Sequence, residues 1–75
     1  MDESIAIKVG RGLRAARLRA SLTQAEAAEA AGLSPEVYGR MERSKLLPSL
    51  PTLTVLCRAF RTSLDEVMGL VSQPT

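Results

Sequence analysis

The 75-residue chain has no histidine, no tryptophan and a single cysteine. One cysteine excludes a disulfide within the chain, and without histidine it cannot supply the Cys and His ligands of a zinc site. The lack of histidine also excludes the Ser/His/Asp and Cys/His forms of nucleophilic catalysis. We therefore expect no catalytic residue, no metal site and no cofactor, and the sequence does not indicate an enzyme.

Long hydrophobic runs are also missing. No apolar stretch approaches the roughly 20 residues of a membrane span, and no signal peptide is visible at the amino terminus. A lone free cysteine fits a reducing compartment. We expect a cytoplasmic protein with no membrane partner and no small-molecule ligand.

Aromatic residues are scarce, with one Phe and one Tyr, so the core must come from Leu, Val, Ala and Met. A core in so short a chain supplies only about 3–5 kcal/mol net, which favours help from a partner or a second copy. Positive charge is concentrated at one end, because residues 1–22 balance to +3 while 23–47 balance to −1 and 48–75 to zero. This clustering favours an anionic partner.

Helix signals recur at short intervals, and the sequence predicts an all-α protein with one domain over residues 1–75. The first helix is expected at roughly 4–20, and the second runs from Thr23 to near Gly32. The third runs from Ser34 to near Arg43, with Pro35 at its first position. The fourth begins at Ser49 and the fifth covers 63 to about 69, after which residues 72–75 are expected to fray.

The apolar residues follow helical stripes. In the first helix we expect Ile5, Val9, Leu13, Ala16 and Ala20 to face the core. In the fourth the corresponding residues are Leu53, Leu56, Cys57 and Phe60. "GRGLRA" at 10–15 imitates a dinucleotide-binding fingerprint, but a second parallel strand and a ribose-binding acid about 20 residues on are not indicated, so we reject that interpretation.

Residues 24–43 are the most informative part of the sequence about fold and function. Two predicted helices there are joined only by a tight turn at 31–33. Ala28 is small where the helices touch, Gly32 makes the turn, and Tyr38 and Met41 point inward. Gly39 then stands inside "SPEVYGRMER", where alanine would suit a helix better by about 1 kcal/mol.

At this point the chain resembles the phage-repressor, Cro-like (XRE-type) helix-turn-helix family. The resemblance rests on "LTQAEAAEAAGLSPEVYGRMERSKLLPSLPTLTVLCRAF" and extends upstream through "VGRGLRAARLRAS" and downstream through "TSLDEVMGL". Arg17, Thr23-Gln24, Ala28, Gly32, Glu42 and Pro48 carry it as an ordered run. It implies a compact five-helix, lambda-repressor-like DNA-binding domain with its helix-turn-helix core at 23–43 and its third helix in the major groove.

The resemblance also implies residue roles. The base-contacting positions are Pro35, Glu36, Val37 and Arg40, and the phosphate-contacting candidates are Gln24, Gly39, Arg43 and Lys45. Arg17 and Glu42 are expected to form an ion pair that ties the first helix to the third. We expect Gly39 to let the helix backbone approach a DNA strand closely.

Three of these roles have competing interpretations. Arg40 either contacts a base or a phosphate or is a solvated charge on an exposed helix. Glu36 either favours the N-terminal turn of its own helix or accepts a hydrogen bond from a cytosine amine. Val37 either belongs to the core or meets a thymine methyl group. The chain also departs from the family, with Ser21 and Ser44 where glycine is usual, and Ala27 and Ala31 where larger apolar residues are usual.

The leading functional hypothesis is a sequence-specific transcriptional regulator, a small dimeric repressor or controller protein that binds operator DNA. We expect a homodimer through the segment 63–71, whose apolar residues are Leu64, Val67, Met68, Leu70 and Val71. The alternative is that these residues cover the domain's own core. The competing function is a protein-interaction module on the same fold, an antitoxin or an antagonist of another regulator, with a regulatory protein as partner.

Overall fold

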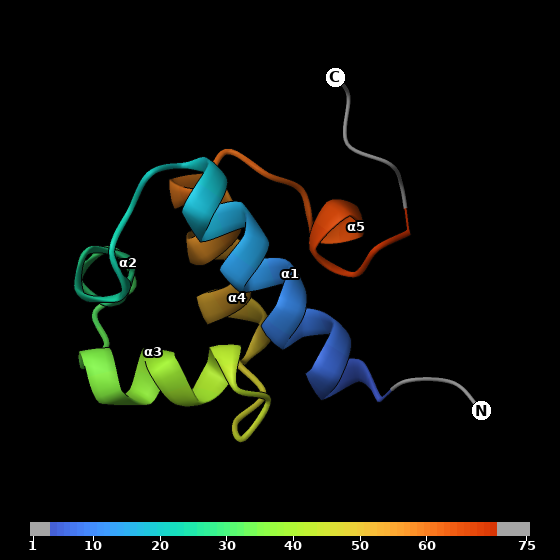
Figure 1. Cartoon of the computed structure of the whole chain (residues 1–75), viewed down its shortest axis with the longest axis horizontal. Coiled ribbons are helices and arrows are strands. Elements are labelled where there is room, and N and C mark those ends of the chain that lie inside the picture. Colours follow the sequence, from blue (N-terminus) through green and yellow to red (C-terminus); the bar gives the residue numbers. More distant parts are fainter. Residues whose placement is uncertain (1–3, 71–75) are drawn as a thin grey trace.

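The computed structural model describes residues 4–70, and over that range it contains five α-helices and no strand. The helices are α1 (Ile5–Arg19), α2 (Gln24–Ala30), α3 (Pro35–Glu42), α4 (Leu50–Ala59) and α5 (Leu64–Val67). In Figure 1, α1 crosses in front of α4, with α2 and α3 on one side and α5 on the other. The all-α, five-helix fold predicted from the sequence is confirmed.

The helices begin where the sequence places side-chain caps. Capping boxes are present at the starts of two helices, with Thr23 and Glu26 before α2 and Ser63 and Glu66 before α5. Each of the other three helices follows a serine whose hydroxyl accepts a hydrogen bond from an N–H of the first turn. These caps are local in sequence, which is why the starts were predictable.

All five helices also end in one way. The second residue past each helix has a positive φ of 55° to 75°, and the N–H after it bonds to the carbonyl five residues back. The left-handed residues are Ser21, Gly32, Ser44, Arg61 and Gly69. Three of the five are not glycine, and each of those pays about 1 kcal/mol or more for the conformation.

The core lies between the helices and contains the chain's only Tyr and only Phe. Tyr38 of α3 and Phe60 at the end of α4 meet edge to face, with ring centroids 6.3 Å apart and planes at 81°. The other buried apolar residues are Val9, Leu13, Ala16, Ala27, Ala28, Met41, Leu53, Leu56, Cys57 and Val67. Two expected members are absent. Ile5 is 58% exposed at the start of α1, and Ala20 is half-buried just past its end and outside the core cluster, so the assignment of both to the buried stripe was wrong.

Two glycines set the depth at which α1 packs. A Cβ on Gly10 would lie 2.7 Å from the carbonyl oxygen of Glu42 at the end of α3. A Cβ on Gly12 would overlap the main chain of Val67 in α5, 2.6 Å from its carbonyl carbon. The "GRG" that imitates a nucleotide-binding loop is therefore a packing feature, which lets the backbones of two other helices approach α1.

Candidate nucleic-acid interface

Helix α3 is held along one edge of the molecule with one side buried and one side open. Ser34 caps its start by accepting a hydrogen bond from the Val37 N–H at 3.1 Å. Tyr38 and Met41 are buried against the core, at 0% and 4% exposure. Figure 1 shows α3 at the lower edge of the fold, with no other helix on its outer side. The outward side is therefore available to a partner.

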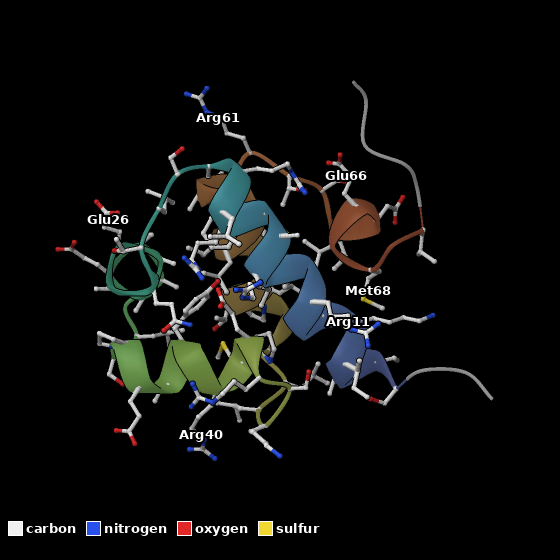
Figure 2. The ribbon with its side chains drawn as sticks, in the orientation of Figure 1. Arg11, Glu26, Arg40, Arg61, Glu66 and Met68 are labelled. Atoms are coloured by element: carbon white, nitrogen blue, oxygen red, sulfur yellow. The ribbon has the colours of Figure 1, made fainter. Side chains whose placement is uncertain are left out.

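The base-contacting candidates are distributed over that outward side. Pro35, Glu36 and Arg40 are exposed, and Arg40 projects away from the rest of the fold in Figure 2. Val37 is half-buried and packs against the core, so its side chain is shared between the interior and the surface. Within residues 4–70, the guanidinium of Arg40 has no hydrogen-bond or ion-pair partner, although Glu36 lies one helical turn away. Helix α3 thus presents one unpaired guanidinium and one carboxylate on its outward side.

A buried polar network fixes the position of α3. Glu42, whose side chain is only 2% exposed, accepts hydrogen bonds from Arg17 Nε to Oε2 at 2.5 Å and from Arg17 Nη2 to Oε1 at 3.2 Å. Gln24 Nε2 donates to the same Oε1 at 3.0 Å, and Arg17 Nη1 donates to the carbonyl of Leu22 at 2.9 Å. The structure thus brings together the expected ion pair and adds Gln24 to it. Three helices, α1, α2 and α3, are joined at one carboxylate.

The network keeps its charges. Burial is the largest influence on the Glu42 carboxyl and raises its pKa, but hydrogen bonds, led by that from Arg17, outweigh burial and leave the pKa below the usual value. The hydrogen bond to Glu42 raises the pKa of Arg17. Burial raises the pKa of Tyr38, whose hydroxyl has no hydrogen-bond partner in the described part of the chain. The pair is therefore ionised and the phenol neutral at neutral pH.

The phosphate-contacting candidates have different surroundings. The amide nitrogen of Gln24 is committed to Glu42, which leaves its oxygen and its backbone N–H for another partner. Gly39 is buried, not open, because the side chains of Arg43 and Gln24 lie over it. Arg43 and Lys45 are exposed just past the end of α3. The expectation that Gly39 lets the helix backbone approach a DNA strand closely did not foresee that side chains of the same chain cover this position.

Comparison with known proteins then decides the family. A family model described as helix-turn-helix matches residues 13–67, which is well over half of the chain. The chain belongs to this family, and to its XRE type. The matched region begins within α1 and ends with α5, so it contains the buried network and the whole of α3.

Individual relatives agree with this assignment. The uncharacterised HTH-type transcriptional regulator YobD of Bacillus subtilis (strain 168) is 34% identical over 62 residues, which are 83% of this chain and 55% of that protein. The chain therefore spans about half the length of this curated relative. Two crystal structures of the clp gene regulator ClgR from Corynebacterium glutamicum superpose with TM-scores of 0.83 and 0.84, each at 28% identity. They cover 91% and 93% of this chain, and 87% and 79% of the ClgR chains. Family and fold are those of DNA-binding transcriptional regulators.

Only some of the apolar residues that were expected to form the dimer contact are exposed at the surface. Val67 is 2% exposed and packs in its own core, so its assignment to a dimer contact was wrong. Met68 is half-buried and packs against the same core, while Leu64 and Leu70 are 41% and 66% exposed. Val71 lies outside the described residues.

An apolar groove next to Leu64 was missed. It has a volume of about 320 Å³ and is lined by Leu50, Leu53, Thr54, Cys57, Arg58, Thr62 and Leu64. Leu50, at the first position of α4, is 65% exposed, the second most exposed large hydrophobic residue of the described range after Leu70. The signal was present in the sequence, because the buried stripe of α4 begins at Leu53 and leaves Leu50 without a role in the core.

Two kinds of site are absent from residues 4–70. No three Cys, Asp or Glu side chains come together there as a set of metal ligands. None of the helices described is both long enough and apolar enough to cross a bilayer.

Proposed function

We propose that the chain is a sequence-specific DNA-binding transcriptional regulator, a small repressor or controller protein that acts as a Cro-like homodimer on operator DNA. The observation that carries this proposal is the outward side of α3, which no other part of the described chain covers and which presents the open guanidinium of Arg40. In a helix-turn-helix protein this is the side that enters the major groove. Arginine reads guanine there through two parallel hydrogen bonds.

Each remaining group on α3 has a role in this proposal. Pro35, which has no side-chain donor, and Val37 offer apolar contact to a thymine methyl group. Glu36 either stabilises the first turn of α3 or accepts from a cytosine amine. Arg43, Lys45 and Gln24 meet phosphates and so fix the register of the helix without reading sequence.

The dimer is proposed through the groove between α4 and α5, with a second copy of the chain as its occupant. Leu50 and Leu64 are both exposed at this groove, and α3 does not line it. A two-fold contact there leaves both α3 helices free to enter successive major grooves, about 34 Å apart on one side of the duplex. Each Leu50 would cover apolar surface on the partner copy.

The test is a gel shift against the DNA upstream of the protein's own gene. We expect a shifted band that weakens as salt rises, because Lys and Arg contacts displace counterions from the phosphates. Arg40→Ala is the control, since it removes the open guanidinium and no contact inside the fold. An unshifted duplex even at low ionic strength would refute the proposal.

A second candidate function rests on Pro35 and Glu36, which are exposed on the outward side of α3. In the DNA-bound arrangement proposed above, the Glu36 carboxylate would face the negatively charged duplex, and the Pro35 ring has no hydrogen-bond donor for it. That surface also suits a protein partner, as in an antitoxin or an antagonist of another regulator. Glu36→Gln separates the two functions. On DNA the change removes repulsion from phosphate and raises affinity, whereas a basic protein partner is bound less tightly. In either case we place the protein in the cytoplasm, without cofactor, small-molecule ligand or enzymatic activity.

A further inference from the structure

Gly39 is the one glycine inside α3, and the structure shows what lies above it. A Cβ built on Gly39 would lie 3.0 Å from Nη1 of Arg43 and 3.8 Å from its Cζ. It would also lie 3.6 Å from Oε1 of Gln24. The bare backbone of Gly39 is thus covered by a guanidinium that starts one turn further along the chain and folds back over the helix.

Core packing does not demand this glycine. The nearest and third-nearest atoms to the missing Cβ belong to the far end of the flexible Arg43 side chain, and the second nearest is Oε1 of Gln24. None of these three atoms belongs to a backbone or to a buried residue. Gly10 and Gly12 are different, because main-chain atoms of other helices occupy their Cβ positions. Alanine at position 39 therefore fits the fold once the Arg43 guanidinium shifts by a few tenths of an ångström from its place over the helix.

The Arg43 side chain that covers Gly39 is itself exposed to solvent. Arg43 is an exposed residue, and its guanidinium has no hydrogen-bond or ion-pair partner among residues 4–70. A long arginine in water otherwise samples many rotamers, and fixing it on a partner costs up to about 2 kcal/mol of rotamer entropy. Contact of the guanidinium with the helix at Gly39, where no side chain intervenes, restricts that freedom before any ligand arrives.

We infer that Gly39 is a positioning residue that seats the Arg43 guanidinium beside Gln24, in the orientation in which Arg43 meets a DNA phosphate. The inference rests on the proposed function, because it assumes that Arg43 contacts the duplex. It replaces the idea that DNA itself must approach the Gly39 backbone. A direct approach requires open space at Gly39, and the Arg43 side chain fills that space.

The inference predicts opposite effects of one substitution on folding and on binding. Gly39→Ala should raise the thermal midpoint of unfolding, because alanine favours the helix over glycine. The same substitution should weaken duplex binding at low salt. The difference from the unaltered chain should narrow by up to about threefold between 50 and 200 mM salt, because one phosphate contact accounts for roughly that factor over this range. The slope of log K against log salt should become shallower by up to about 0.9.

The experiment is a double-substitution cycle on a 30-base-pair duplex of random sequence, since phosphate contacts do not depend on sequence. Affinity is measured by fluorescence anisotropy over a salt series for the unaltered chain, Gly39→Ala, Arg43→Ala and the double variant. We expect Gly39→Ala to lose affinity and salt slope in the same direction as Arg43→Ala but to a smaller extent, because it shifts the guanidinium and does not remove it. The double variant should lose no more than Arg43→Ala alone.

Three outcomes overturn the inference. Full affinity and an unchanged salt slope for Gly39→Ala would show that the position of the Arg43 guanidinium over residue 39 does not matter for DNA binding. An equal loss from Gly39→Ala with and without Arg43 would show that the DNA itself meets position 39. If the unaltered chain binds no duplex at low salt, the proposed function fails, and the inference fails with it; in the first two outcomes the proposed function survives.

Discussion

Replacing Arg17 by methionine tests the network that fixes the recognition helix. The substitution keeps a long apolar side chain but removes every donor that Arg17 gives to Glu42 and to the Leu22 carbonyl. Glu42, with a side chain only 2% exposed, then keeps only the amide of Gln24. Removing one partner of a buried ion pair costs about 3–5 kcal/mol. That matches the whole net stability expected of so small a core, about 3–5 kcal/mol, so the variant should be largely unfolded at pH 7.

The pH dependence gives the sharper part of this prediction. In the unaltered chain the Glu42 pKa is lowered on folding, so its contribution to stability is present above the unfolded pKa near 4.5 and is lost as the pH falls through the lower folded value. In Arg17→Met the main influences that lower the pKa of Glu42, the hydrogen bond and the charge of Arg17, are removed. Burial then dominates, and the folded pKa is raised. Stability should then be gained as the pH falls from 7 towards 5, the opposite direction.

Urea unfolding followed by circular dichroism between pH 4 and 7 measures both effects. The control is the double variant Arg17→Met/Glu42→Met, in which no buried charge is left, and it should recover most of the loss at pH 7. The reasoning fails if Arg17→Met is as stable as the unaltered chain at pH 7. It also fails if the two proteins lose stability in parallel as the pH falls.

Three further predictions concern packing and assembly. Gly12→Ala should lower the free energy of unfolding by about 1–3 kcal/mol in chemical denaturation, because the added Cβ overlaps the Val67 main chain, and an unchanged value would contradict the close approach of α1 and α5. Ser44→Gly should raise it by about 0.5 kcal/mol, because glycine relieves the left-handed conformation but adds freedom to the unfolded chain. Leu50→Glu should give a folded monomer in sedimentation equilibrium at high micromolar concentration, where the unaltered chain should be a dimer; a monomer in both would rule out the dimer contact proposed at α4 and α5.

Sequence patterns predicted the features that depend on neighbouring residues. The pair Thr23 and Glu26 forms a capping box whose bonds span three residues, so the start of α2 could be placed without knowing the rest of the fold. The inward direction of Tyr38 and Met41 followed from their spacing on α3, which the structure confirms. The Arg17–Glu42 pair joins residues 25 positions apart, and only the family resemblance indicated it.

The features that were missed depend on contacts between distant segments. Helical spacing placed Ile5 with the buried stripe, but spacing does not reveal where the neighbouring helices end. The spacing of glycines at 10 and 12 suggested a loop motif, because only the fold shows the backbones of α3 and α5 behind them. Gly39 was expected to leave the helix backbone open to a DNA strand, and its cover by Arg43 depends on a rotamer that composition does not specify.

The most direct test of the central claim, that the outward side of α3 reads a duplex groove, is selection from a pool of random DNA. The unaltered chain and Arg40→Ala are carried through the selection side by side. The account predicts that the unaltered chain enriches a two-fold palindrome and that Arg40→Ala loses preference at one guanine-containing base pair in each half-site. Enrichment of the same motif by both proteins, or of none by the unaltered chain at low salt, would contradict the account.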